Sequence, residues 1–439
     1  MRAFLLAVTF AALPAAAQDL QQIYRDAKSY DAQYAAARHA RQAGLEKLPQ
    51  GRALILPTLN LSGNATNTRT ESDPHDSQLP STLRDGRAYG YSLSFSQPIF
   101  RMQNNLQYSQ AEFQVKQAEA VFGQAGQDLI VRTAQAYFDV LAAQDTLALV
   151  QAQKIAIGEQ LAQAKRNFEV GTATITDTHE AQARFDLAAA QEIAAQSDVE
   201  TKRRALQQIT GKEYATLRPL RPQVRLSPPN PANMENWVVL AEKQSYPVQI
   251  QDTVAEIANL EAKRNTAGHY PTVDLVASYG WTSQTASSQL TTGPSNITTG
   301  VFGVQLGLPL YQGGAISSRE REAAANYEKS KQDLENARRS TALTARQSFL
   351  AVTNGIAQVG ALEQALVSSQ SALDSNKLGY EVGVRINIDV LNAQQQLFST
   401  RRDLALARYN TITSHLKLKA AAGSLREEDL EEVNRALGP

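Results

Sequence analysis

The sequence contains no cysteine, although the chain has 439 residues. A chain without cysteine has no disulfide, no thiol nucleophile and no thiolate-bound metal. It also has no excess of charge of one sign, because 43 Lys and Arg stand against 43 Asp and Glu. Nucleic-acid binding needs a surplus of Lys and Arg to neutralise phosphates, so this balance argues against a nucleic-acid partner.

Long apolar runs are equally scarce. After the first few residues, no stretch reaches the ~18 to 20 consecutive apolar residues that a helix needs to cross a bilayer. Aromatic residues make up 7% of the chain, and the mean hydropathy is −0.35. Taken alone, these values describe a soluble, neutral, helical protein, but the patterns along the chain indicate a membrane protein.

Residues 1–17 are expected to be a signal peptide. Arg2 gives a positive start, residues 3–13 are apolar, and residues 15–17 (AAA) fit a cleavage site between small residues. A transmembrane anchor is the alternative, but the run is short and Pro14 interrupts it. The sequence therefore predicts export, to a compartment in which the absence of stray thiols is favourable.

The chain is expected to consist of two structural repeats. Residues 168–171 (FEVG) recur as residues 380–383 (YEVG), an offset of 212, and this offset also relates Asp177 to Asp389 and Gly211 to Gly423. The repeats are predicted over residues 18–218 and 236–423. A proline-rich linker over 219–235 separates them, and a terminal segment over 424–439 follows.

Within each half, the hydrophobic period changes from helix to strand and back. Helices are predicted over 20–52 and 236–265, and strands over 57–67, 88–98, 271–282 and 300–310, with a polar loop over 72–86. Apolar side chains alternate with small polar ones along each strand. Such alternation is found in half-buried sheets of globular proteins and in the strands of outer-membrane barrels, and it does not by itself decide between them.

Each pair of strands is followed by a very long helix. Residues 99–168 and 312–380 contain no proline, and a run of this length would extend for roughly 100 Å at about 1.5 Å per residue. Apolar residues repeat every seven positions in both runs, with Lys154 as a polar exception, which predicts coiled-coil packing. Gly171 and Gly383 are expected to end these helices as left-handed caps. Second helices are predicted over 176–210 and 388–422.

Closing a barrel requires several copies of the chain. Four strands cannot close a membrane barrel, and an open sheet edge cannot face lipid. Two chains would give eight strands with a filled interior, whereas three would give twelve strands around a lumen. A trimer is therefore the simplest assembly that conducts.

Two strings carry a resemblance to a known family. Residues 379–393 (GYEVGVRINIDVLNA), followed by residues 407–410 (ARYN), resemble the hallmark of the TolC family of outer-membrane efflux and secretion ducts. Residues 168–177 (FEVGTATITD) are similar to its first-half counterpart. The resemblance implies an α+β fold in the outer membrane of a Gram-negative bacterium. A homotrimer would form a 12-strand β-barrel continuous with a 12-helix periplasmic α-barrel, with a mixed equatorial belt made by the linker and the terminal segment.

The resemblance also implies partners. These are a periplasmic adaptor (membrane fusion) protein and an inner-membrane pump, either an ABC exporter of proteins or a proton-driven drug pump of the RND type. The barrel would contact outer-membrane lipid. The implied function is the exit duct of a type I protein secretion or multidrug efflux machine, opened at its periplasmic end when the adaptor and pump dock.

Site residues follow from the resemblance position by position. The closed periplasmic entrance would be tied by Tyr380 and Arg385, which bridge to Asp177 and Thr176. A constriction ring would lie at Asp389, and its second position falls on Asn392, where the family pattern has aspartate. This departure halves the expected ring charge from six carboxylates to three and weakens the expected binding of cations.

Three of these residues also have a purely structural interpretation. Asp177 with Glu180 fits a capping box at a helix start. Asp389 fits an acidic residue of the first helical turn, which the helix dipole favours, and Arg385 fits a solvated loop charge.

Catalysis and cofactors find no support in the motifs. The five histidines are scattered, and no HExxH, G-x-S-x-G, P-loop or G-x-G-x-x-G pattern occurs. No enzyme activity, metal site or cofactor is therefore expected. A periplasmic coiled-coil adaptor is the alternative function, because it would share the helical hairpins, although it would not explain the paired amphipathic strands.

Overall fold

The computed structural model describes residues 18–73, 75, 82–221, 224, 226–285 and 293–438. The expected signal peptide, much of the expected loop over 72–86 and three residues of the linker lie outside this range. The chain divides into two compact units. Unit 1 comprises Met1–Ala40, Ala120–Gln249 and Asn336–Pro439, and unit 2 comprises Arg41–Glu119 and Ile250–Glu335.

In each half, short helices precede two strands and two long helices follow them, and α10 comes after the second half. The first half contains α1 (Leu20–Tyr30), α2 (Ala32–Leu45), α3 (Lys47–Ala53), β1 (Thr58–Ser72), β2 (Thr82–Phe100), α4 (Met102–Glu169) and α5 (Ile175–Thr210). The second contains α6 (Met234–Gln244), α7 (Tyr246–Thr266), the short 3-10 helix η1 (Ala267–His269), β3 (Thr272–Gln284), β4 (Ser295–Gly307), α8 (Ala315–Glu381), α9 (Asn387–Ala421) and α10 (Asp429–Arg435). In the described part of the chain, no helix combines the length and apolar character needed to span a membrane.

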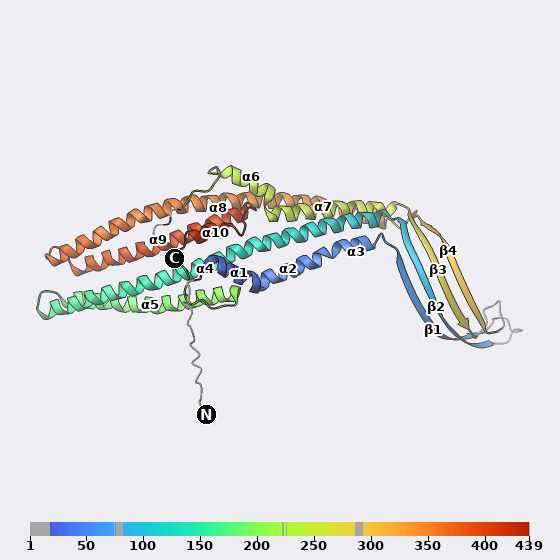
Figure 1. The fold of residues 1–439 in the computed structure, drawn as a ribbon, viewed down its shortest axis with the longest axis horizontal. Coiled ribbons are helices and arrows are strands. Elements are labelled where there is room, and N and C mark those ends of the chain that lie inside the picture. Colours follow the sequence, from blue (N-terminus) through green and yellow to red (C-terminus); the bar gives the residue numbers. More distant parts are fainter. Residues whose placement is uncertain are drawn as a thin grey trace, which may run out of the picture. The chain divides into compact units, whose positions relative to one another are not determined.

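Unit 2 contains one antiparallel sheet, in which the strands lie in the order β1-β2-β3-β4 (Figure 1). The registers place one residue of each strand in a common row, for example Leu61, Leu93, Tyr279 and Gly300. Because side chains alternate between faces, this row and every second row from it form one apolar face. The opposite face carries rows of small polar residues such as Ser62, Ser92 and Gly280.

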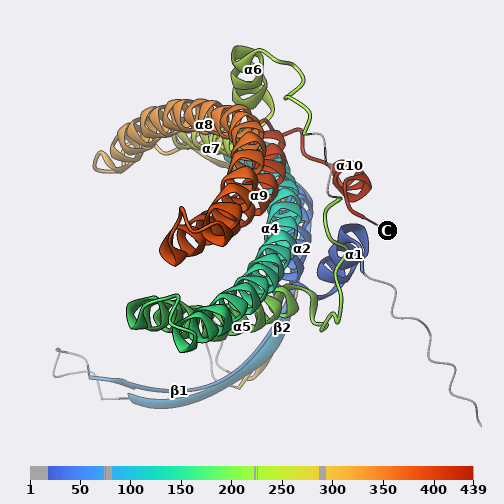
Figure 2. The same cartoon turned by 90° about the vertical axis from the view of Figure 1, so that its left-hand side faces the viewer.

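The apolar face of the sheet is exposed in the single chain. Leu61 is 74% exposed and Phe302 is 78% exposed. Tyr91 stacks on Trp281 with ring centroids 6.0 Å apart, and Tyr89 meets the same indole edge-on at 5.8 Å. The sheet is strongly curved (Figure 2). An apolar face with clustered aromatics toward one end is typical of a strand surface in contact with lipid.

The strands extend further than the sequence pattern predicts. Asp85 and Gly86, expected in a turn-rich loop, belong to β2 and pair with Arg69 and Thr68 of β1. The polar residues at these strand ends are held by the ladder of main-chain hydrogen bonds, which does not depend on side-chain polarity.

An ion pair fixes the point where β2 passes into α4. The Arg101 guanidinium donates through Nε and Nη2 to both carboxylate oxygens of Asp274 on β3, at 2.7 and 2.5 Å. Asp274 is 5% exposed. A bidentate salt bridge of this kind is directional, so it orients the first turn of α4 relative to the sheet.

Unit 1 is built around helical hairpins, in which α4 lies beside α5 and α8 lies beside α9 (Figure 2). The heptad positions of the long helices are buried in these hairpins, as at Leu129, Ala164, Val352 and Leu373. The polar exception Lys154 bonds Glu192 of α5 at 2.8 Å. Hydrogen bonds from Lys154 and Gln151 hold the pKa of the Glu192 carboxyl below its ordinary value.

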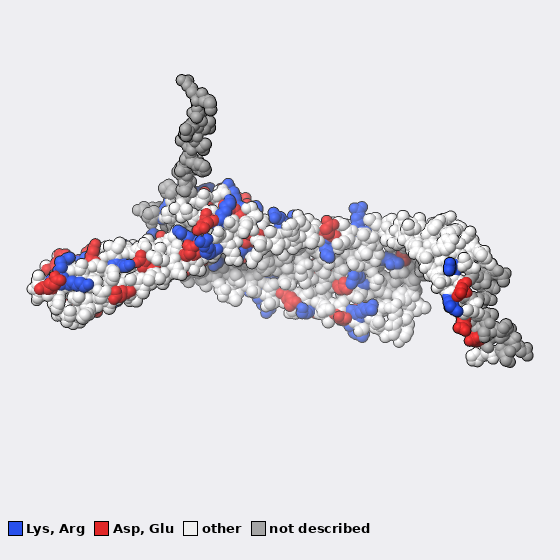
Figure 3. Space-filling model, turned by 90° about the horizontal axis from the view of Figure 1, so that it is seen from below, with Lys and Arg blue, Asp and Glu red and all other residues white. Residues whose placement is uncertain are grey.

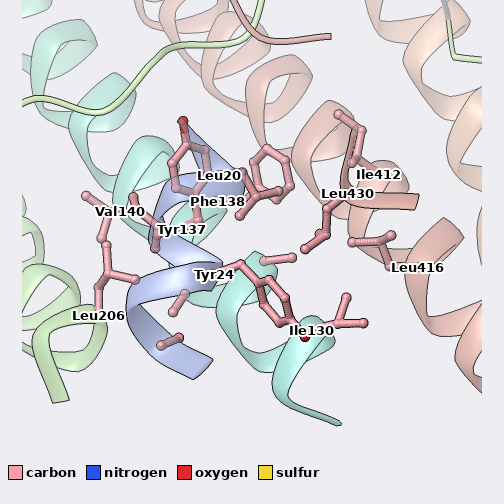
Figure 4. Close-up of a cluster of buried hydrophobic side chains, with 14 of the residues drawn as sticks. Leu20, Tyr24, Ile130, Tyr137, Phe138, Val140, Leu206, Ile412, Leu416 and Leu430 are labelled. Atoms are coloured by element: carbon pink, nitrogen blue, oxygen red, sulfur yellow. The ribbon is translucent and has the colours of Figure 1, made fainter. Parts of the chain in front are cut away.

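The largest core of unit 1 joins the two halves of the sequence (Figure 4). It brings Leu20 of α1 and Tyr137 of α4 together with Leu416 of α9 and Leu430 of α10. The Tyr137 hydroxyl donates to the carbonyl oxygen of Arg218 at 2.8 Å. This bond ties the start of the linker to the core.

The linker and the terminal segment lie together in unit 1. Leu220 and Leu437 form an antiparallel bridge. The N–H of Gly438 donates to the carbonyl oxygen of Pro219 at 2.7 Å. The two segments expected to contribute to one belt are therefore in direct contact within the chain.

Two helices expected to be continuous are interrupted. Instead of one helix over 20–52 there are three, because Asp31 adopts a non-helical conformation and its carboxylate accepts a bond from the N–H of Tyr34 at the start of α2. A second break precedes α3, which contains Pro49. Instead of one helix over 236–265, α6 ends before Ser245, since Pro247 has no N–H to continue the helical bonds.

Acidic and basic side chains are interspersed over the helices. On the face drawn in Figure 3, no large surface of one sign appears. This distribution agrees with the equal numbers of acidic and basic residues in the sequence.

Candidate gate at the ends of the helical hairpins

The tips of both hairpins are closed in the same way. Gly171 and Gly383 have φ angles of 79° and 80°, a conformation that glycine adopts without a steric penalty. The N–H of Thr172 donates to the carbonyl oxygen of Asn167 at 2.8 Å, and the N–H of Val384 donates to that of Gly379 at 2.9 Å. Both bonds span five residues and satisfy carbonyls left free at the end of a helix, as in the Schellman motif.

Asp177 is part of a capping box at the start of α5. Its N–H donates to Oγ1 of Thr174, and its carboxylate accepts bonds from the N–H and the hydroxyl of Thr174 at 2.9 and 2.7 Å. The box thus begins three residues earlier than the predicted pair of Asp177 and Glu180. The reason is that Thr174 is the extended residue before the helix, so Asp177 occupies the third helical position. Thr176 is exposed.

Tyr380 connects the two hairpins of one chain. Its hydroxyl oxygen accepts a hydrogen bond from Nδ2 of Asn167 at 3.1 Å, between the end of α8 and the end of α4. Within the single chain, the structure therefore brings Tyr380 to Asn167 and leaves Asp177 bonded to Thr174.

Arg385 and Asp389 form an ion pair across the start of α9. Nη1 of Arg385 lies 3.6 Å from Oδ2 of Asp389, and the two side chains are 59% and 33% exposed. An exposed pair of this kind contributes about 0 to 1 kcal/mol to stability. Such a weak contact can be exchanged for another at little cost.

Asn392 contacts an arginine that the sequence analysis did not identify. Its Oδ1 accepts a bond from Nη2 of Arg184 on α5 at 3.0 Å. No motif marks Arg184, because the contact joins residues 208 positions apart and depends on how α5 meets α9. In the described ranges, no group of three or more His, Cys, Asp or Glu is arranged to hold a metal ion.

Comparison with known proteins gives one family. The model of the family described as "Outer membrane efflux protein" matches residues 23–212 and 249–424. The outer membrane protein TolC of Vibrio cholerae is 33% identical over 96% of this chain and 94% of its own length. The alkaline protease secretion protein AprF of Pseudomonas aeruginosa is 33% identical over 93% of this chain and 85% of its length.

Solved structures share the fold at lower identity. The CmeC outer membrane channel of Campylobacter jejuni superposes with a TM-score of 0.78 at 17% identity, covering 95% of this chain and 90% of its own. The outer membrane protein VceC of Vibrio cholerae gives 0.76 at 19% identity, covering 92% and 96%. These matches are to channels rather than enzymes, and they do not favour the periplasmic adaptor as the alternative function.

Proposed function

Since the chain belongs to the outer membrane efflux protein family and is an outer-membrane exit duct, we propose that it works as a homotrimer at the end of a tripartite export machine. The observation that carries this proposal is the four-stranded sheet with an apolar face and two open edges, β1 and β4. In lipid each unpaired backbone group costs several kcal/mol, so these edges must pair with other copies.

Three copies satisfy both the edges and the need for a lumen. Pairing β1 of one copy with β4 of the next gives a closed barrel of 12 strands around a water-filled path. The apolar face contacts outer-membrane lipid, and the rows of serine and glycine line the interior. The hairpins α4–α5 and α8–α9 of three copies would form the walls of a 12-helix periplasmic tunnel. The linker and the terminal segment would form the belt around it.

The two halves of the chain are proposed to be structural repeats. Their elements follow the same order, and the paired glycines have nearly the same backbone conformation: φ is 79° and 80° at Gly171 and Gly383, and 72° at both Gly211 and Gly423. With two repeats per chain, a trimer has approximate sixfold symmetry, which suits a tunnel of 12 similar helices.

The hairpin tips are proposed to dock a periplasmic adaptor protein. Val170, Val382 and Val384 are exposed at these tips by 73%, 65% and 75%. Apolar side chains grouped at an exposed turn favour a protein partner. The pump recruited with the adaptor is an ABC exporter or a proton-driven pump of the RND type, which gives type I secretion or multidrug efflux.

The entrance is proposed to be gated by weak polar ties at the same end. In the closed state, Tyr380 and Arg385 would give up the partners that they have within the single chain and would bond Asp177 and Thr176 instead. Some of these bonds would join neighbouring copies. Asp389, with Asn392 one turn later, would form the constriction ring. Such ties are directional but individually modest near solvent, so a docking adaptor can break them.

Single-channel recording tests the gate. The double variant Tyr380→Phe and Arg385→Ser should conduct several times more than the wild type in planar bilayers, because the first change removes the phenol hydroxyl and the second removes the guanidinium. Arg401→Ser is the control, since its guanidinium bonds Gln370 well behind the tip, and its conductance should equal the wild type. An unchanged conductance in the double variant would remove the gate assignment.

A further inference from the structure

Arg184 is held in a fixed place beside the proposed constriction. Its Nη2 donates to Oδ1 of Asn392 at 3.0 Å, and its Nη1 donates to Oε1 of Gln395. The two acceptors are three residues apart and therefore lie on the same face of α9. A guanidinium matches such a pair because its N–H groups point outward in a rigid fork.

The packing beneath this contact holds α5 and α9 together. Leu391, which precedes Asn392, is 3% exposed and lies in a cluster with Ile157 of α4 and Ala188 of α5. Phe185, which follows Arg184, packs against the same cluster. The two helices are therefore in contact at this level, and the Arg184 guanidinium lies over α9, where it makes its two bonds.

The partners of Arg184 do not cancel its charge. Both acceptors are neutral amides, and in the part of the chain that the structure describes no ion pair of Arg184 with a carboxylate within 4.0 Å is found. Asp389 lies three residues before Asn392, one turn along α9, and already has Arg385 at 3.6 Å. In each chain, the guanidinium groups of Arg184 and Arg385 thus lie within about one Debye length of Asp389, the one carboxylate that the chain contributes to the proposed ring.

We propose that Arg184 is a selectivity-determining residue of the entrance, which offsets the charge of Asp389 and so lowers the preference of the duct for cations. This inference rests on the proposed constriction at Asp389 and adds a residue to it. Asn392 has a specific part in the arrangement, because an aspartate there would pair with Arg184 and neutralise it.

The reversal potential of the full-length mature protein in planar bilayers under a KCl gradient tests the proposal. Arg184→Gln should raise the ratio of potassium to chloride permeability by at least roughly two- to sixfold, since that is the effect on one ion of one charge about 8 to 10 Å away at an effective dielectric constant of about 40 to 80, and a homotrimer loses three such charges. Arg184→Lys keeps the charge and should keep the ratio near the wild-type value. Asp389→Asn should lower it.

Arg401→Gln is the matched control. Arg401 also lies on α9 and donates to a glutamine amide, Oε1 of Gln370, at 3.1 Å. It is 12 residues from Asp389, roughly 18 Å along the helix, so the ratio should not change.

The outcomes separate this inference from the proposed function. If Asp389→Asn shifts the ratio and Arg184→Gln does not, the role of Arg184 is overturned and the constriction stands. If Asp389→Asn has no effect, the constriction itself is wrong, and the inference falls with it. Equal shifts in Arg184→Lys and Arg184→Gln would also overturn the proposal, because the effect would then come from the lost contact and not from charge.

Discussion

At the scale of single residues, a half-buried carboxylate joins the two long hairpins of unit 1. The Tyr409 hydroxyl on α9 donates to Oδ2 of Asp145 on α4 at 2.6 Å, and the Tyr409 ring packs on Phe138 with centroids 5.6 Å apart. Burial raises the pKa of the Asp145 carboxyl above its ordinary value, although the bond from Tyr409 works in the other direction. Asp145 therefore keeps its proton in the folded protein at pH values where the unfolded chain has lost it, so its ionisation lowers stability as pH rises above about 4.

Replacement of Tyr409 by phenylalanine should make the stability of the protein fall more steeply as the pH rises. Among the causes that shift the pKa of Asp145, the bond from Tyr409 is the one that favours the charged carboxylate, and the variant loses it. A polar group left without a partner inside a protein costs about 1 to 3 kcal/mol. The melting temperature, followed by circular dichroism between pH 4 and pH 8, should fall further below the wild type as the pH increases.

The double variant Tyr409→Phe and Asp145→Asn provides the control for this experiment. It carries no titrating carboxyl at the site, so its difference from the wild type should be much less dependent on pH. A gap between Tyr409→Phe and the wild type that stays constant from pH 4 to pH 8 would contradict the assignment of Asp145 as the titrating group.

Individual contacts were the part of the site that the sequence could not supply. The turns at Gly171 and Gly383 follow from the FEVG and YEVG strings, because glycine after a long helical pattern predicts a left-handed cap. The bonds of Asn167 to Tyr380 and of Arg184 to Asn392 join positions 213 and 208 apart, close to but not at the repeat offset of 212. They depend on the relative rotation of two packed helices, for which no local signal exists.

At the scale of elements, periodicity located the helices and strands better than it located their ends. The long helices run over Met102–Glu169 and Ala315–Glu381, within three residues of the ranges expected from the absence of proline. The break at Asp31 has no such marker, because it arises from a side chain that bonds the backbone three residues later. Side-chain caps of this kind compete with helix continuation and are decided by tertiary contacts, here the two bonds from Arg132 to Asp31.

The start of α5 allows the capping role of Asp177 to be separated from its proposed gating role. Thr174→Ala removes the hydroxyl that accepts from the Asp177 N–H and donates to its carboxylate, and it should cost about 0.5 to 2 kcal/mol of stability. Asp177→Asn keeps a side chain that can still accept the bond from the Thr174 N–H, but it removes the charge proposed to hold Arg385. We therefore expect Thr174→Ala to lower the melting temperature with little change in conductance, and Asp177→Asn to raise single-channel conductance with a smaller thermal effect.

Melting curves and planar-bilayer recordings of the same two preparations decide this prediction. If both variants raise conductance equally, the order of the helix start and not the charge of Asp177 controls opening. That result would leave Asp177 as a cap alone.

At the scale of the whole molecule, the sheet edges decide how copies assemble. Pairing of β1 with β4 of the next copy must keep the apolar faces of the two copies continuous. A slip of one residue in this register would place the apolar face of one copy beside the polar face of the other, and so turn its apolar side chains toward the lumen. The rows of the sheet place Leu61 on the same face as Gly300, Phe302 and Val304, and Ser62 on the face of Val301 and Gly303. Within one chain, β1 and β4 are three strand spacings apart, about 14 Å, so a direct disulfide between them can form only between chains.

The natural absence of cysteine makes this pairing directly measurable. Each variant would carry Leu61→Cys together with one further cysteine in β4 of the same chain. Disulfides between chains should form when the second cysteine is at an even position between 298 and 306, and hardly at all when it is at an odd position. Non-reducing electrophoresis of oxidised outer membranes should then show covalent dimers and trimers at even positions only. Ser62→Cys is the matched control, for which the pattern should move to the odd positions. Cross-linking without this alternation, or none at any even position, would contradict a barrel closed by β1 and β4 of neighbouring copies, because a continuous lipid-facing surface permits one parity alone.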